Sequence, residues 1–238
     1  MSAVAEERLV RQRELALSYR IFAALRWGDL GDGHITARDP EQHDCFWVLR
    51  YSVPFERATI DELILVGPDG TIVDGHGPLN TTAYHIHWPI HEARPDVVAA
   101  AHTHTHWGTP FSAERRLLQP ITQEACAFHD DHALFDDEEV QVLSTDGGKR
   151  IAAALGAKRA VILANHGLLT TGAAVGEAVG AFVMMERVCE GLLKAPTARP
   201  ISGTSARRAR DGLGLPGAFA DSFEFLVARH VPDPGAVG

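Results

Sequence analysis

Hydrophobic residues recur at helical spacing in several stretches of the chain. In residues 5–27, Leu9 and Leu17 fall on one side of a helix and Glu7 falls on the other. The glycine-rich residues 28–33 end this helix, because glycine favours turns. Further helices are predicted over residues 83–93, 111–117, 149–155, 173–194 and 219–229.

Other stretches are alternating or continuously apolar, which is typical of β-strands. The predicted strands cover residues 34–40, 46–50, 63–66, 71–73 and 96–108, with another from Arg159 to the Asn165-His166-Gly167 turn; residues 119–128 are predicted as a loop that enters a strand. Past Lys194 the composition shifts to Pro, Ser, Thr and Arg. We therefore expect one domain over residues 1–194, with a linker, a short helix and a flexible tail over residues 195–238.

Three histidines alternate with threonine where the predicted strand 96–108 ends. Side chains two residues apart in a strand point to the same side, so His102, His104 and His106 are expected to share one face. Imidazoles at this spacing can bind one cation at about 2 Å. A further ligand has to come from elsewhere, and His166, exposed by its turn at another strand end, is the best candidate.

Each of these assignments has a structural alternative. The alternating histidines could belong to a solvated polar strand. His87 and His91 lie one turn apart on a predicted helix, where either could face the His102 strand or simply pack. Glu124, flanked by apolar residues, could supply a carboxylate to the site or remain a surface residue.

Composition excludes several partners and compartments. The chain has 22 Lys and Arg against 31 Asp and Glu, a net charge of −9, and its basic residues cluster only at 207–210, so we expect no nucleic-acid partner. Its three cysteines, Cys45, Cys126 and Cys189, are widely separated, which indicates a reducing cytoplasm. We expect no membrane span and no signal peptide, because no apolar stretch is long enough and the N-terminus carries acids.

Four segments together carry a family resemblance: residues 33–40, 86–96, 101–105 and 164–168. They resemble the class II aldolase/adducin family, and the likeness extends from the first helix to about Lys194. The resemblance implies a three-layer α/β/α fold around a mainly antiparallel central sheet. It also implies a homotetramer with active sites at subunit boundaries, and a divalent metal bound by His102, His104 and His166.

The chain departs from the family aldolases at three places. Ala83 stands where their catalytic glutamate would be, so the usual base for enediolate formation is missing. His34 replaces an asparagine, and residues 50–53 lack a Thr-Gly pair that helps to hold substrate phosphate. Of that set, only the hydroxyls of Thr81 and Thr82 remain. A phosphorylated sugar is therefore not the expected substrate.

The amino-acid sequence of the opening helix and of residues 27–34 most resembles that of a branch of this family from aminocoumarin antibiotic pathways. Those proteins are non-haem iron oxygenases that convert a prenylated 4-hydroxyphenylpyruvate to the mandelate and then the benzoate by oxidative decarboxylation. The resemblance implies Fe(II), with Zn(II) as the alternative, O2 as co-substrate and a small aromatic acid as substrate.

Three residues are candidates for catalysis beside the metal. His34 and His87 could carry protons near neutral pH. Glu124 could supply a carboxylate to the metal site, either as a direct ligand or through contact with a ligand. Two other functions remain open: a zinc-dependent aldolase or decarboxylase with a different base, and a non-catalytic adducin-like binding module. The missing glutamate favours the binding module, whereas the intact metal histidines argue against it.

Overall fold

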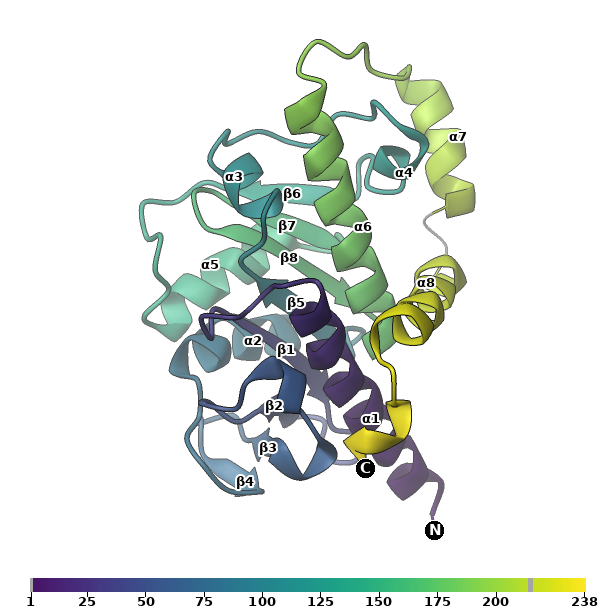
Figure 1. Ribbon diagram of the computed structural model, residues 1–238. Helices are drawn as coiled ribbons and strands as arrows, with labels where there is room; N and C mark the ends of the chain where they lie inside the picture. The colour runs from purple at the N-terminus through teal and green to yellow at the C-terminus, as the bar shows by residue number, and fades with distance from the viewer. Residues whose placement is uncertain (1, 214–215) are drawn as a thin grey trace.

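One eight-stranded sheet forms the centre of the computed structural model, which describes residues 2–213 and 216–238 (Figure 1). The strands are β1 (Gly33–Arg38), β2 (Phe46–Leu49), β3 (Leu63–Val66), β4 (Ile72–Asp74), β5 (Ala99–Thr103), β6 (His132–Phe135), β7 (Ala160–Leu163) and β8 (Gly167–Gly172). Their order is β4-β3-β2-β1-β5-β8-β7-β6. Neighbours are antiparallel except β6 and β7. The mainly antiparallel α/β fold is therefore confirmed.

Helices cover both faces of this sheet and make three layers. They are α1 (Ala3–Ala24), α2 (Thr81–Ala93), α3 (Gly108–Ser112), α4 (Gln123–Cys126), α5 (Thr145–Leu155), α6 (Val175–Lys194), α7 (Gly203–Leu213) and α8 (Pro216–His230). In Figure 1, α1, α6 and α8 lie in front of the sheet, while α2 and α5 lie behind it. An asparagine cap begins α2: the Asn80 side chain accepts hydrogen bonds from the amides of Thr82 and Ala83.

Strand alternation divides the buried residues between the two faces. Ile35 and Ala37 of β1 belong to the large apolar cluster beneath α1 and α6. His34 and Thr36 point the opposite way, toward α2, and both are buried. The face of the sheet under α2 therefore carries buried polar groups beside its apolar cluster.

Two short segments differ from the sequence predictions. Residues 119–128 contain the short helix α4 instead of entering a strand, because the Thr122 side chain caps the amide of Ala125 and begins a helical turn. The predicted helix 111–117 occurs earlier, as α3 at Gly108–Ser112. Both helices are too short for a clear hydrophobic period in the sequence.

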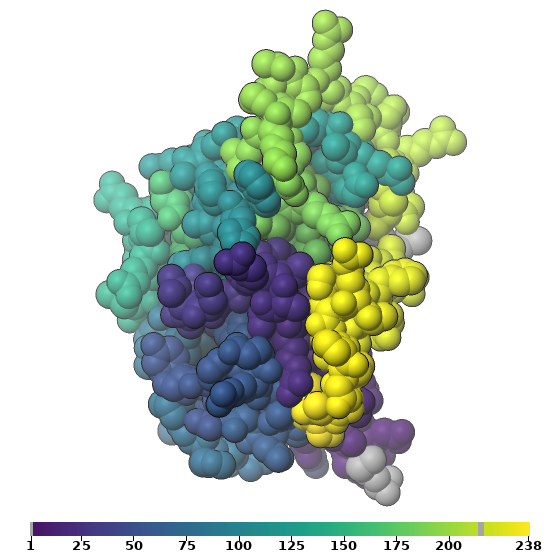
Figure 2. Space-filling model, viewed as in Figure 1, coloured from purple at the N-terminus to yellow at the C-terminus, as the bar shows by residue number. Residues whose placement is uncertain are grey.

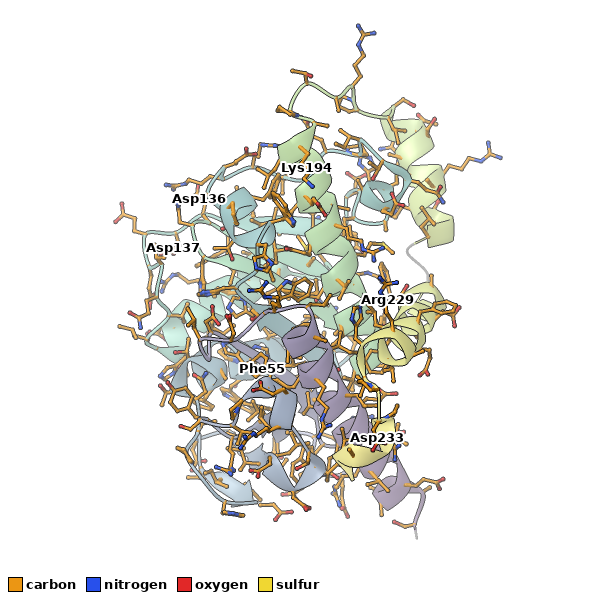
Figure 3. The ribbon with its side chains drawn as sticks, viewed as in Figure 1. Phe55, Asp136, Asp137, Lys194, Arg229 and Asp233 are labelled. Carbon is orange, nitrogen blue, oxygen red and sulfur yellow. The ribbon has the colours of Figure 1, made fainter. Side chains whose placement is uncertain are left out.

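The C-terminal segment also differs from the prediction of one short helix and a flexible tail. It forms α7 and α8, and Phe219 and Phe223 of α8 belong to the main core with α6. The last residues lie along α1 (Figure 2), where the Arg13 and Arg20 guanidinium groups donate to tail carbonyls. Asp233 of this tail is labelled in Figure 3. Burial of Val237 fastens the tail, which a polar, proline-rich sequence does not predict.

No helix in the described part of the chain combines the length and the apolar character that crossing a bilayer requires.

Candidate metal centre

The first two clustered histidines come from the end of β5. His102 is 2% exposed and pairs with His34 of β1 on one side and Leu169 of β8 on the other. Its Nδ1 donates to the Leu168 carbonyl at 2.7 Å, which leaves Nε2 free. The strand ends at Thr103, so His104 lies just outside the sheet, and its amide donates to the Asp32 carbonyl.

The third histidine lies in the turn between β7 and β8. Asn165 adopts a φ of 59°, a left-handed conformation that asparagine tolerates better than most residues. The Asn165 amide donates to the Ser112 carbonyl, and the His166 amide donates to the Leu163 carbonyl. These bonds fix the turn and direct the His166 ring across the sheet toward β5.

The three rings converge on one point. The ligand nitrogens of His102, His104 and His166 lie within 4.8 Å of one another, and the ring centroids are 4.8 to 5.6 Å apart. Within residues 2–213 and 216–238, they form the single group of three or more His, Cys, Asp or Glu side chains with this geometry. His106 is exposed in a turn and does not join them, because β5 ends before the alternation reaches it.

Burial favours the neutral form of two of the ligand rings, those of His102 and His166. It lowers the pKa of His102 well below the ordinary value, with further lowering by His166 and His34. Burial also lowers the pKa of His166 to about 4, and His104 adds to this shift. Neutral imidazole is the form that coordinates a metal, so the donor set fits a divalent cation with positions left open for other ligands.

A carboxylate that the sequence analysis missed lies beside these histidines. Asp32 Oδ2 is 3.4 Å from Nδ1 of His104, on the far side of the ring from Nε2. The other carboxylate oxygen, Oδ1, is buried without a hydrogen-bond partner. In the sequence, Asp32 lies between Gly31 and Gly33, and this glycine-rich stretch predicts only a turn.

We expect Asp32→Asn to weaken metal binding about 10-fold, because partners that orient a ligating histidine typically contribute 10- to 100-fold to affinity. The measurement is competition of the purified protein with a chromogenic zinc chelator. Asp29→Asn, in the same turn but exposed, is the matched control and should bind normally. Equal affinities for both variants would show that Asp32 does not support His104.

The histidines line a cavity of about 450 Å³ that adjoins a second one of about 440 Å³. Of the described residues that line the first cavity, Asp32 alone carries a carboxylate, and Asn80, Thr82 and Asn165 add neutral polar groups. His34 borders both cavities. The apolar part of the second cavity is lined by Tyr19, Trp27, Leu49, Val53 and Phe55, the last labelled in Figure 3. The cavity at the histidines is thus joined to a second cavity that has an aromatic and aliphatic wall.

The remaining candidate residues are placed differently. The His34 ring centroid is 4.9 Å from that of His102, and His34 Nδ1 is 2.7 Å from Nε2 of His87. Glu124 is exposed on α4, which packs on α6 and α7, and it does not line the histidine cavity within this chain. Ala83 is fully buried in an apolar cluster with Phe46.

A buried carboxylate on α6 supports the loop that follows the histidines. Glu186 is 4% exposed and accepts hydrogen bonds from the Thr105 hydroxyl and from the amides of Trp107 and Gly108, at 2.6 to 2.9 Å. Burial raises the pKa of Glu186, and these three donors oppose the shift. Glu186 therefore ties the segment after His104 to the core.

Comparisons with known proteins identify relatives of the chain. The model of the Class II Aldolase and Adducin N-terminal domain matches residues 13–193. A protein of Streptomyces roseochromogenus subsp. oscitans named 4-hydroxy-3-prenylphenylpyruvate oxygenase/4-hydroxy-3-prenylbenzoate synthase is 41% identical over 215 residues, which cover 88% of this chain and 78% of that protein. Decarboxylase NovR of Streptomyces niveus is 41% identical over 196 residues, which cover 82% and 73% of the two chains.

A solved structure extends the likeness to the whole fold. L-fuculose 1-phosphate aldolase from Glaciozyma antarctica PI12 superposes with a TM-score of 0.86 at 34% identity, covering 96% of this chain and 91% of that one. The matched family segment contains every strand of the sheet and all three clustered histidines. The chain therefore belongs to the class II aldolase and adducin family.

Proposed function

We propose that the chain is a non-haem Fe(II) oxygenase that cleaves a carbon–carbon bond of an aromatic 2-oxo acid by oxidative decarboxylation. The observation that carries this proposal is the combination of a complete histidine cluster with Ala83, a buried apolar residue, in the place of the family's catalytic glutamate. An aldol cleavage needs that base, whereas an oxidative cleavage does not. Two relatives are named as an oxygenase and as a decarboxylase, which supports the same choice.

His102, His104 and His166 would hold the metal ion, and Asp32 would orient the His104 ring. A divalent ion held there would supply Lewis-acid polarisation of the 2-oxo group and, as Fe(II), the chemistry that activates O2. Asn80, Thr82 and Asn165 offer hydrogen-bond donors to a carboxylate in the same cavity. A hydroxyphenyl ring with an apolar substituent could pack against the wall of the adjoining cavity that Phe55 and Trp27 help to form.

The reaction has a fixed stoichiometry that an experiment can follow. Conversion of 4-hydroxyphenylpyruvate to the mandelate consumes one O2 and releases the substrate carboxyl group as one CO2, with one oxygen atom of O2 entering the new carboxylate and the other the benzylic hydroxyl. Conversion of the mandelate to the benzoate consumes a second O2 and releases CO2 and water. The protein is reconstituted with Fe(II) under anaerobic conditions and then supplied with O2 and either 4-hydroxyphenylpyruvate or its 3-prenylated analogue.

Coupled O2 uptake and CO2 release at equal amounts is the expected result, with the prenylated compound preferred. Carbon–carbon cleavage that proceeds without O2 would contradict the oxygenase proposal. Tight zinc binding with no O2 uptake would also contradict it. The homotetramer and the cytoplasmic location implied by the sequence analysis stay predictions.

A zinc-dependent aldolase or decarboxylase is the second candidate. Three histidines with no ligating carboxylate suit zinc at least as well as iron. Asp32, in the cavity and with an unpartnered oxygen, would then be the substitute base. Such an enzyme would turn over substrate in the absence of O2, and Asp32→Asn would abolish this turnover. An adducin-like binding module without catalysis gives no reason for the histidines to converge.

A further inference from the structure

The loop between β6 and α5 forms part of the wall of the histidine cavity. It comprises residues 136–143, which we call the strap. The strap residues that line this cavity are Val140, Gln141 and Val142. Two of them, Val140 and Val142, also border a smaller cavity together with His166, so the strap lies beside this histidine. A movement of the strap would therefore change the space around a candidate metal ligand.

The strap is attached to the rest of the protein mainly by side chains. Val142 is 1% exposed and packs in an apolar cluster with Ile151 of α5. Within the described residues, the strap makes one backbone–backbone hydrogen bond, which runs locally from the Val140 amide to the Glu138 carbonyl. The Val140 side chain is 48% exposed. Few backbone bonds and exposed side chains are typical of segments that open locally.

Arg150 of α5 holds the strap through two carboxylates. Its Nε donates to Asp137 Oδ2 at 2.8 Å, and its Nη2 donates to Glu139 Oε2. Asp136 pairs in turn with Arg115, which follows α3. Asp136 and Asp137 are labelled in Figure 3, at the start of the strap. A planar guanidinium that binds two carboxylates at once fixes their positions relative to each other, which a single ammonium does less well.

The first turn of α5 has room for Glu139 because it contains a glycine. A Cβ on Gly147 would lie 2.8 Å from Oε2 of Glu139 and 3.0 Å from Cγ1 of Val142. The other carboxylate oxygen, Oε1, accepts from the amide of Leu143 at 3.2 Å, just before the helix begins. A carboxylate beside the N-terminal turn of a helix is also favoured by the helix dipole. The start of α5 and Arg150 therefore favour the same position of the strap.

We propose that the strap is a movable wall of the histidine cavity, and that Arg150 is the positioning residue that latches it. With Asp137 and Glu139 bound to Arg150, the strap narrows the approach to His166. When these ion pairs open, the strap moves away and the approach widens. The three side chains of the latch are 25 to 46% exposed, so salt weakens their attraction. The proposal concerns access to the site and does not depend on the reaction carried out there.

Hydrogen exchange of the full-length, metal-free protein tests the latch. We expect Arg150→Gln to speed exchange of the strap amides about 3- to 10-fold, the size expected for the loss of two partly exposed ion pairs. The amides of α2, which packs on α5, should be unchanged. Lys149→Gln is the matched control, because Lys149 is exposed on the same helix and takes no part in the ion pairs of the strap.

Two results of this experiment would overturn the proposal. Equal strap exchange in Arg150→Gln and Lys149→Gln would show that Arg150 does not hold the strap. Faster exchange throughout α5 in Arg150→Gln would show that the arginine stabilises the helix and does not latch the loop.

Transfer of bound Zn(II) to the chelator 4-(2-pyridylazo)resorcinol provides a second readout. We expect Arg150→Gln to speed the transfer about 3- to 10-fold, with Arg150→Lys in between. Sodium chloride at about 1 M should speed transfer from the unmodified protein but not from Arg150→Gln, which already lacks the screened ion pairs. Equal rates in Arg150→Gln and Lys149→Gln would contradict the proposal. Because hydrogen exchange uses the metal-free protein, it decides on the strap even if the histidines bind no zinc.

Discussion

His102→Ala and His166→Ala should each abolish metal retention, and with it all metal-dependent turnover. Each substitution removes one of three candidate ligand nitrogens that lie within 4.8 Å of one another. Loss of a residue that merely orients a ligand typically weakens metal binding 10- to 100-fold, so loss of a ligand should weaken it by at least about 100-fold. Metal content is measured by mass spectrometry after dialysis of the Fe(II)- or Zn(II)-loaded protein.

His106→Ala is the matched control for these variants. It removes the same side chain four residues from His102, but His106 is exposed and outside the cluster. We expect it to retain metal at the level of the unmodified protein. Normal metal content in His102→Ala or His166→Ala, with an unchanged circular dichroism spectrum, would rule out the proposed site.

Glu186→Ala should lower the free energy of unfolding by about 3 to 5 kcal/mol. This is the second of the two largest effects that we expect. The carboxylate accepts from the Thr105 hydroxyl and from the amides of Trp107 and Gly108, and its removal leaves three donors without their partner in a buried place. The loop after His104 should also lose its anchor, so metal affinity should fall as well. Urea unfolding of the metal-free protein measures the first effect.

A second glutamate on α6 serves as the control for this prediction. Glu190 lies one turn further along the helix and pairs with Lys194 near the surface. Glu190→Ala should change the free energy of unfolding by less than about 1 kcal/mol, as exposed ion pairs do. If Glu186→Ala were no more destabilised than Glu190→Ala, the loop would be held by its other contacts.

Glu186→Gln separates the charge of this residue from its hydrogen bonds. The amide keeps one acceptor oxygen, so the variant should lie between the alanine variant and the unmodified protein. Its metal affinity should recover in parallel with its stability, because both depend on the position of the loop.

The α/β fold, the strands beside the site and the three clustered histidines could largely be predicted from the sequence. The periods of two and 3.6 residues report which side chains share a face, and strand ends mark where polar groups emerge. His102 and His104 are close in sequence, and the Asn165-His166-Gly167 turn at another strand end indicated His166. The alternation of histidine and threonine wrongly predicts that His106 shares the face of His102 and His104, because periodicity does not show where a strand ends.

Contacts across the sheet were decided only by the tertiary structure. His34 and His87 are 53 residues apart, and Thr105 and Glu186 are 81 residues apart, so no local pattern joins either pair. The sequence predicts only that Asp32 lies in a turn, and the fold places its carboxylate beside His104. The packed C-terminal tail was unpredictable for the same reason, because its stability comes from α1 and not from its own composition.

The sequence by itself therefore determined which chemical groups are available and which helix or strand carries them. The tertiary structure alone decided how they meet: a histidine cluster, a carboxylate beside one of its rings, and a buried hydrogen bond between His34 and His87. The physical reason is that hydrophobic periodicity encodes burial, whereas the hydrogen bonds of buried polar groups depend on the packing of elements that are distant along the chain.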